Sequence, residues 1–79
     1  MFYTYVLKDE QGKIYKGMTN NLKRRLAEHC SGQTETTSRM SNLVLVYKEK
    51  YATFEEARKR ELYLKSVAGR RFLKLNMPR

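Results

Sequence analysis

The stretch TFEEARKRELYLKSVAG, residues 53–69, decides the fold of this chain. It lacks proline, and Thr53 with Glu56 forms a Thr-x-x-Glu capping box, so we expect a helix that begins there and stops at Gly69. Glu61 falls in the middle of its apolar face, which at about 100° per residue holds Phe54, Ala57, Leu62, Leu64 and Ala68. A buried carboxylate needs a cation, a metal ion or a hydrogen-bond network. An ion pair with Arg or Lys and a metal site are equally open from this helix alone.

Three segments before this helix are typical of strands. Residues 2–7 and 13–17 flank a polar turn that ends in Gly12, which predicts a hairpin. A five-residue loop or a bulge would place Tyr5 opposite Tyr15, with Gly17 on the same face, whereas an even-length loop would split them across the two faces. Residues 43–47 (LVLVY) form a continuous apolar run. That run indicates a strand covered on both faces, and we expect it to be the central one.

A second helix is expected over residues 22–31, after three good N-cap residues and before Gly32. Arg25 and His29 are one turn apart along the border of its apolar seam. The polar segment that follows, residues 33–42, contains Arg39 and is long for so short a chain, which favours a functional loop. With a short helix over residues 70–76, the element order is β-β-α-β-α-α. We therefore expect one α+β domain over residues 1–79, with a small sheet flanked by helices.

Charge is the main compositional signal. The chain has 17 Lys and Arg against 8 Asp and Glu, a net charge of +9, which predicts attraction to a polyanion, with nucleic acid the first candidate. A basic surface kept for solubility is the alternative. The sequence has no apolar run of membrane-spanning length and no signal-peptide pattern, so we expect a cytoplasmic protein without a membrane role. One cysteine and one histidine do not make a structural zinc site.

Four fragments, taken in order, resemble the GIY-YIG endonuclease domain. They are Tyr-x-Tyr-Val-Leu from Tyr3, Tyr-x-Gly-x-Thr from Tyr15, Arg-x-x-x-His from Arg25 and Glu-x-x-x-Lys from Glu61. Each fragment is weak alone, but the ordered set is specific and covers essentially the whole chain. It is most similar to the small stand-alone bacterial proteins of the YhbQ type, related to the N-terminal incision domain of UvrC. The resemblance implies a three-stranded antiparallel sheet flanked by helices.

The resemblance also implies phosphodiester cleavage with one divalent metal ion, Mg²⁺ or Mn²⁺. Glu61 then matches the metal ligand and Arg25 the arginine that contacts the scissile phosphate. Tyr5 and Tyr15 match the tyrosines that position or deprotonate the attacking water, and His29 assists acid–base work. These roles suit the side chains. A guanidinium clamps phosphate in a bidentate, permanently charged way, whereas a phenol, with an ordinary pKa of about 10, needs a neighbouring cation to serve as a base.

Four further positions are expected to contact nucleic acid: Lys16, Gly17, Arg39 and Lys65. Lys65 can instead be the salt-bridge partner of Glu61. The sequence departs from the family pattern at Tyr3, where Gly is usual, at Lys16 in place of Ile, and at Met18, where the repair incision domain has Lys.

The sequence therefore favours a metal-dependent DNA endonuclease of low or structure-based specificity, acting in DNA repair or processing. We expect a protein partner or an unusual DNA shape to supply targeting, because no second DNA-binding module is evident. The rival is a binding module that keeps the nuclease fold without turnover. The nuclease is favoured because a binder has no need of a carboxylate that faces a polyanion.

Overall fold

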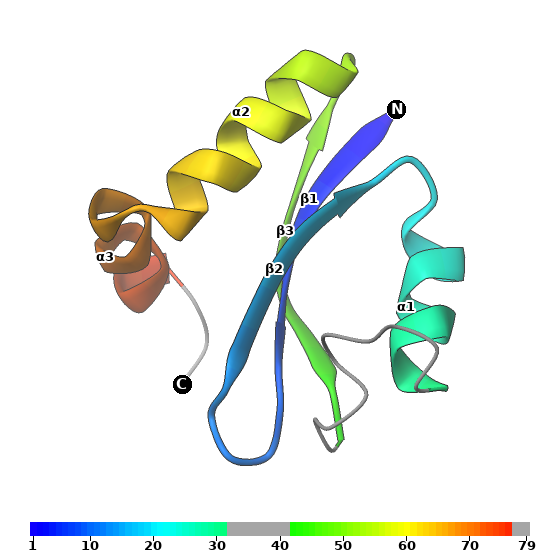
Figure 1. Ribbon diagram of the computed structural model, residues 1–79, viewed down its shortest axis with the longest axis vertical. Coiled ribbons are helices and arrows are strands. Elements are labelled where there is room, and N and C mark those ends of the chain that lie inside the picture. The colour runs from blue at the N-terminus through cyan, green and yellow to red at the C-terminus, as the bar shows by residue number, and fades with distance from the viewer. Residues whose placement is uncertain (32–41, 77–79) are drawn as a thin grey trace.

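A sheet of three antiparallel strands carries one helix on one face and two on the other (Figure 1). The computed structural model describes residues 1–31 and 42–76. The elements along the chain are β1 (Phe2–Lys8), β2 (Ile14–Thr19), α1 (Leu22–Cys30), β3 (Val44–Tyr51), α2 (Phe54–Lys65) and α3 (Val67–Asn76). This arrangement confirms the predicted α+β class and the order β-β-α-β-α-α. Arg39 and most of the polar segment around it lie outside the described residues.

The hairpin has the odd-length loop that puts the phenols on one face, but its register differs from the expected one. Tyr5 pairs with Gly17 and Leu7 with Tyr15, so the two tyrosines are diagonal rather than opposite. The Asp9 carboxylate accepts hydrogen bonds from the backbone N–H groups of Gln11 and Lys13, at 3.0 and 2.7 Å. These bonds hold a five-residue loop over residues 9–13, one residue later than the loop over residues 8–12 that would pair Tyr5 with Tyr15, so every cross-strand pair is shifted.

The prediction that residues 43–47 form the central strand is wrong. The sheet order is β2-β1-β3, so β1 is central and β3 lies at an edge. Four consecutive residues of β1, from Thr4 to Leu7, are buried because helices cover both faces of the strand, whereas Val44 in β3 is 58% exposed. The strand also continues beyond Tyr47 through alternating charged residues to Tyr51.

The C-terminal helices confirm one predicted boundary and correct another. Thr53 caps α2, since its hydroxyl accepts from the Glu56 backbone N–H at 3.3 Å. The helix ends at Ser66 rather than at Gly69, and the Ser66 hydroxyl accepts from the Gly69 N–H at the start of α3. Gly69 is therefore not a stop signal. A Cβ atom there would lie 2.0 Å from the Tyr63 carbonyl oxygen, so the residue must be glycine for α3 to turn back against α2.

The main apolar core lies between the sheet and α2 and α3. Val6, Leu64 and Leu73 form its buried centre, with three partly buried neighbours, Val46, Tyr47 and Phe72. Thr4, also on this face, donates to the Ala57 carbonyl of α2 at 2.8 Å. Tyr5 and Leu7 point to the opposite face, where α1 lies, because successive strand residues alternate between faces. The two faces of β1 and β2 therefore present different side chains to different helices.

Candidate functional site

On the α1 face, the structure brings together the four residues that we call the phenol cluster, Tyr5, Tyr15, Arg25 and His29. Tyr5 is completely buried on the central strand, and its hydroxyl lies 2.9 Å from His29 Nε2 and 3.4 Å from Arg25 Nε. The Tyr15 ring packs on His29 with centroids 4.8 Å apart. Arg25 and His29 reach these phenols because they are one turn apart on α1, which the Asn21 side chain caps by accepting from the Arg24 N–H.

Gly17 allows the two tyrosines to approach each other. It lies opposite Tyr5 in the sheet, and a Cβ atom at this position would be 2.8 Å from the Tyr5 hydroxyl oxygen and 3.0 Å from the Tyr15 ring. Only glycine leaves room for the Tyr5 phenol to cross β2 and reach His29. In this structure the motif glycine therefore makes space for a side chain.

The electrostatics of the cluster favour neutral groups at Tyr5 and His29. The pKa of Tyr5 is raised to about 12, because burial raises it by more than the hydrogen bond from Arg25 lowers it. Burial, together with the Arg25 charge, lowers the pKa of His29. At neutral pH the phenol is thus protonated and the imidazole uncharged, so we assign the Tyr5 O–H as donor to His29 Nε2. The cation that was expected to activate a tyrosine is present, but at Tyr5 desolvation outweighs it.

Arg25 is held in place while part of it stays accessible. Its Nε donates to the Tyr5 hydroxyl and its Nη1 pairs with Glu28 Oε1 at 3.3 Å. The hydrogen bond to Tyr5 is the main cause that raises the pKa of Arg25, so its guanidinium is permanently charged. A third of its side chain remains exposed, which leaves N–H groups available to an anion.

Glu61 lies on the other face of the sheet, in a group that we call the carboxylate site, Arg58, Glu61 and Lys65. The carboxylate residue is 6% exposed. Its Oε1 accepts from Arg58 Nη1 at 2.7 Å and its Oε2 from Lys65 Nζ at 3.2 Å, and both cations are about half exposed. Lys65 is thus the ion-pair partner that the sequence left as an alternative. Arg58 was missed, although its i,i+3 spacing to Glu61 signals such a contact.

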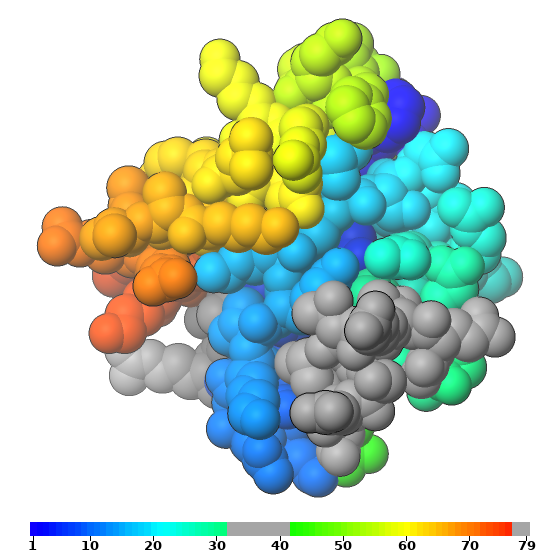
Figure 2. Space-filling view, viewed as in Figure 1, coloured from blue at the N-terminus to red at the C-terminus, as the bar shows by residue number. Residues whose placement is uncertain are grey.

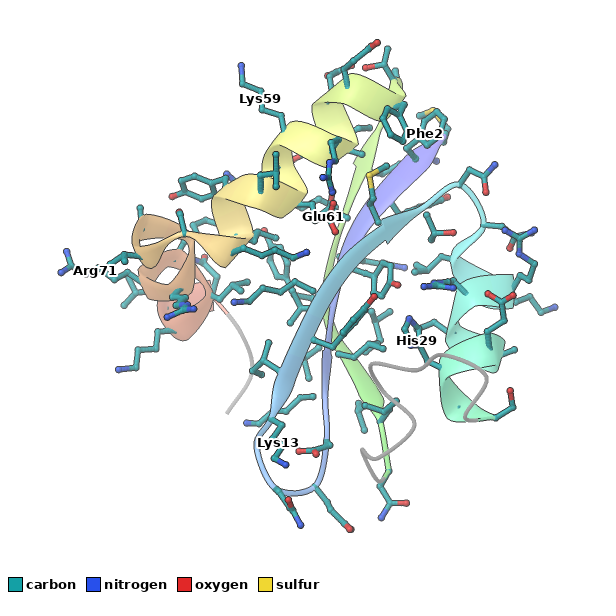
Figure 3. All side chains as sticks on the ribbon, in the orientation of Figure 1. Phe2, Lys13, His29, Lys59, Glu61 and Arg71 are labelled. Carbon is teal, nitrogen blue, oxygen red and sulfur yellow. The ribbon has the colours of Figure 1, made fainter. Side chains whose placement is uncertain are left out.

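The two groups lie on opposite sides of β2. Figure 3 shows Glu61 on α2 and His29 on α1, with β2 between them. Tyr15 and Gly17 face α1, whereas Lys16 projects from the opposite face, where burial and then the charges of Arg70 and Lys65 lower its pKa. In Figure 2 the blue atoms of β2 are bordered by α2 and α3 on one side and by α1 on the other. A ligand that crosses the free edge of β2 can therefore meet both groups.

A divalent metal ion at the carboxylate site would have one protein ligand among the described residues, the Glu61 carboxylate. Groups of three or more His, Cys, Asp or Glu that could enclose an ion are absent from residues 1–31 and 42–76. Mg²⁺ does not require such a cage, because it keeps most of its waters and binds through one or two carboxylates. The Glu61 oxygens are buried and paired with two half-exposed cations, so a single carboxylate would hold a hydrated ion there and no closed site is formed.

Comparison with known proteins places these features in a family. The model of the GIY-YIG catalytic domain matches residues 1–76. A UPF0213 protein of Staphylococcus saprophyticus is 34% identical over 74 residues, covering 92% of this chain and 90% of the relative. One from Clostridium perfringens is 36% identical over 76 residues, covering 95% and 82%.

A solved structure agrees with this result. The solution NMR structure of a UPF0213 protein from Bacillus halodurans is similar with a TM-score of 0.58 and 30% identity, covering 95% of this chain and 82% of that one. The resemblance inferred from the four fragments is thereby confirmed, as is the three-stranded fold. Within the described residues, no helix has the length and apolar character needed to cross a membrane.

Proposed function

The chain belongs to the GIY-YIG family, and on that premise we propose that it is a metal-dependent endonuclease that hydrolyses DNA phosphodiester bonds. Its selectivity is for nucleic-acid structure, or is low, and its role is in DNA repair or processing in the cytoplasm. The observation that carries the proposal is the placement of a buried carboxylate and an Arg–Tyr–His cluster on the two sides of one exposed strand edge. The net charge of +9 supports a polyanionic substrate.

Each side chain of the phenol cluster has a distinct role in this proposal. Arg25 binds the scissile phosphate through the N–H groups that Tyr5 and Glu28 leave accessible. Tyr15 is the half-buried phenol and orients the attacking water, whereas Tyr5 is fully buried and acts as a positioning residue. The Tyr5 hydroxyl fixes the Arg25 and His29 side chains, and the uncharged His29 accepts the Tyr5 O–H at Nε2 and so holds the phenol in place.

Glu61 is the proposed ligand of one Mg²⁺ or Mn²⁺ ion. Such an ion supplies Lewis-acid polarisation of the phosphate and stabilises the leaving oxygen. With an ion bound to Glu61, Lys65 and Arg58, which pair with the carboxylate in this structure, would be available to the nucleic-acid backbone. Lys16 and Lys65 then contact phosphates on the α2 side of β2, as we expect Arg39 to do elsewhere.

The test is cleavage of duplex, single-stranded, flapped and branched DNA in Mg²⁺ and Mn²⁺ by wild type, Glu61→Gln and Glu55→Gln. Glu55 is an exposed carboxylate on the same helix and serves as the matched control. We expect metal-dependent cutting by wild type and Glu55→Gln and none by Glu61→Gln, which should still bind DNA. Cutting that survives in Glu61→Gln would reject the assigned role of that residue.

A second candidate is a nucleic-acid-binding module that keeps the nuclease fold without turnover. Two observations favour it: both oxygens of Glu61 are already paired with cations, and Tyr5 and His29 are at most 2% exposed. Tight, salt-sensitive DNA binding with no cutting in either metal would select this candidate. In both cases a protein partner or a DNA shape supplies targeting.

A further inference from the structure

A row of cations extends from the carboxylate site along β2 to α3. Lys65 contacts Glu61, and its charge, like that of Arg70, acts on Lys16 across the face of β2. Arg70 and Lys74 follow on α3, one turn apart. Neither Arg70 nor Lys74 was singled out by the sequence, because in an Arg- and Lys-rich chain no local pattern distinguishes them from solvated surface charges.

Three of these cations, Lys16, Arg70 and Lys74, surround a hollow between β2 and α3. The hollow has a volume of about 290 Å³ and is lined by Ile14, Lys16, Arg70, Leu73 and Lys74. Leu73 is buried and Ile14 is 37% exposed, so the lining combines apolar and cationic side chains. A sugar–phosphate unit matches this combination, because its sugar has an apolar face and its phosphate needs charged donors.

Within residues 1–31 and 42–76, the cations around this hollow have no carboxylate as a close counter-charge. Among the described residues, no carboxylate oxygen lies within 4 Å of the side-chain nitrogens of Lys16, Arg70 or Lys74. Four other cations do have such a partner: Arg25, Arg58, Arg60 and Lys65. Burial and the like charges of Arg70 and Lys65 lower the pKa of Lys16. Bringing like charges together is unfavourable unless an anion offsets them. The arrangement therefore suits an external anion.

We propose that Lys16, Arg70 and Lys74 form a second phosphate-binding site, which holds the nucleic-acid strand next to the phosphate at the carboxylate site. This inference rests on the proposed function for the identity of the neighbouring phosphate. The nucleic-acid strand runs along the edge of β2, from the side where Glu61 lies toward α3. Side chains of β2 and α3 hold it. The α3 helix thus has a role in binding in addition to its packing on α2.

The experiment measures DNA binding in EDTA, where no cleavage occurs, by fluorescence anisotropy with a fluorescein-labelled duplex. The hollow variant is Arg70→Gln with Lys74→Gln. The matched control is Lys59→Gln with Arg71→Gln, which removes the same charge from side chains that Figure 3 shows pointing away from the sheet. All four residues are exposed, and equal thermal unfolding midpoints would show that both variants fold.

The salt dependence of binding provides the readout. Each phosphate contact contributes about 0.9 to the slope of log K against log salt for duplex DNA. We expect the hollow variant to lower this slope by about 1 to 2 relative to wild type and the control to leave it nearly unchanged. Equal slopes for the hollow variant and the control would overturn the proposal.

Single neutral methylphosphonates, introduced at successive backbone positions, locate the contact. At one or two positions the neutral linkage should weaken DNA binding by wild type but not by the hollow variant. The variant has already lost the contact between this phosphate and Arg70 and Lys74, so removing the phosphate charge has no further effect. Absence of such a position would also overturn the proposal. If wild type cleaves DNA but the hollow variant has the same salt slope as wild type, only the second phosphate site is rejected. If the hollow variant lowers the slope but wild type does not cleave DNA, only the nuclease proposal is rejected.

Discussion

The position of the Tyr5 hydroxyl requires that residue 17 has no side chain, because a Cβ atom at Gly17 would lie 2.8 Å from the phenolic oxygen. We expect Gly17→Ala to lower the free energy of unfolding by about 1–3 kcal/mol, since an overpacked, hydrogen-bonded ring has nowhere to move. Urea unfolding measures the change. In a Tyr5→Phe background the loss should be smaller, because the clashing oxygen is gone. An equal loss in both backgrounds would show that Tyr5 is not the residue displaced.

His29 should make stability depend on pH, because its pKa in the folded chain is lowered by burial and by Arg25. Below the ordinary value of about 6.5 the unfolded chain binds a proton that the folded chain does not. The free energy of unfolding is thus highest above that pH and falls as the pH drops through it, with a slope of at most about 1.4 kcal/mol per pH unit.

The chain has a single histidine, so an NMR titration of its ring protons is unambiguous. We expect a midpoint below 6.5. Urea unfolding between pH 7.5 and 5.5 should show a smaller pH dependence in His29→Asn than in wild type. A midpoint at or above 6.5 would mean that the folded site stabilises the imidazolium and that the neutral imidazole assigned here is wrong.

Among the helices, the contact of α2 with α3 depends on Gly69. A Cβ atom there would lie 2.0 Å from the Tyr63 oxygen and 2.4 Å from the Leu64 Cα, and neither backbone atom can move without unwinding the end of α2. We expect Gly69→Ala to reduce the free energy of unfolding by more than about 3 kcal/mol or to prevent folding. Circular dichroism during thermal unfolding measures it.

The control for this prediction is Gly12→Ala. Gly12 has a φ of +87° but nothing within 4 Å of the added Cβ, so only backbone strain of about 1–3 kcal/mol is expected. A larger loss at position 12 than at position 69 would contradict the close packing of α2 against α3.

Local sequence predicted the elements better than their arrangement. Thr53 and Glu56 give the start of α2 because a cap is made by neighbours in sequence, and the spacing of Ala57, Glu61 and Leu64 gives its buried face. The sheet order could not be predicted, because the central place of β1 depends on helices packing on both of its faces. Phe54 and Leu62 were expected on the buried face of α2 but are about half exposed, because the buried face of this helix is limited to Ala57, Glu61 and Leu64.

The candidate site shows the same limit at the scale of the whole molecule. Motif spacing predicted Tyr5, Tyr15, Arg25, His29 and Glu61 as site residues, and the fold gathers the first four in one cluster. Glu61 lies across β2 from this cluster because strand side chains alternate between the two faces of the sheet and because α1 and α2 pack on opposite faces. No single segment of the sequence encodes this arrangement. Arg58 could have been found from its i,i+3 spacing to Glu61. The cations of α3 needed the three-dimensional arrangement, because their charges look like those of any basic surface.

The whole-molecule charge leads to a last prediction, on binding without metal. Glu61 opposes a polyanion and occupies Arg58 and Lys65, so Glu61→Gln removes a repulsive charge and frees two cations. We expect it to tighten DNA binding in EDTA by about 1–2 kcal/mol, roughly five- to thirtyfold at low salt. Fluorescence anisotropy measures this. Glu55→Gln makes the same change in net charge without freeing a partner, and its effect should be smaller. Equal tightening by both variants would mean that net charge alone controls binding and that Arg58 and Lys65 do not reach the DNA.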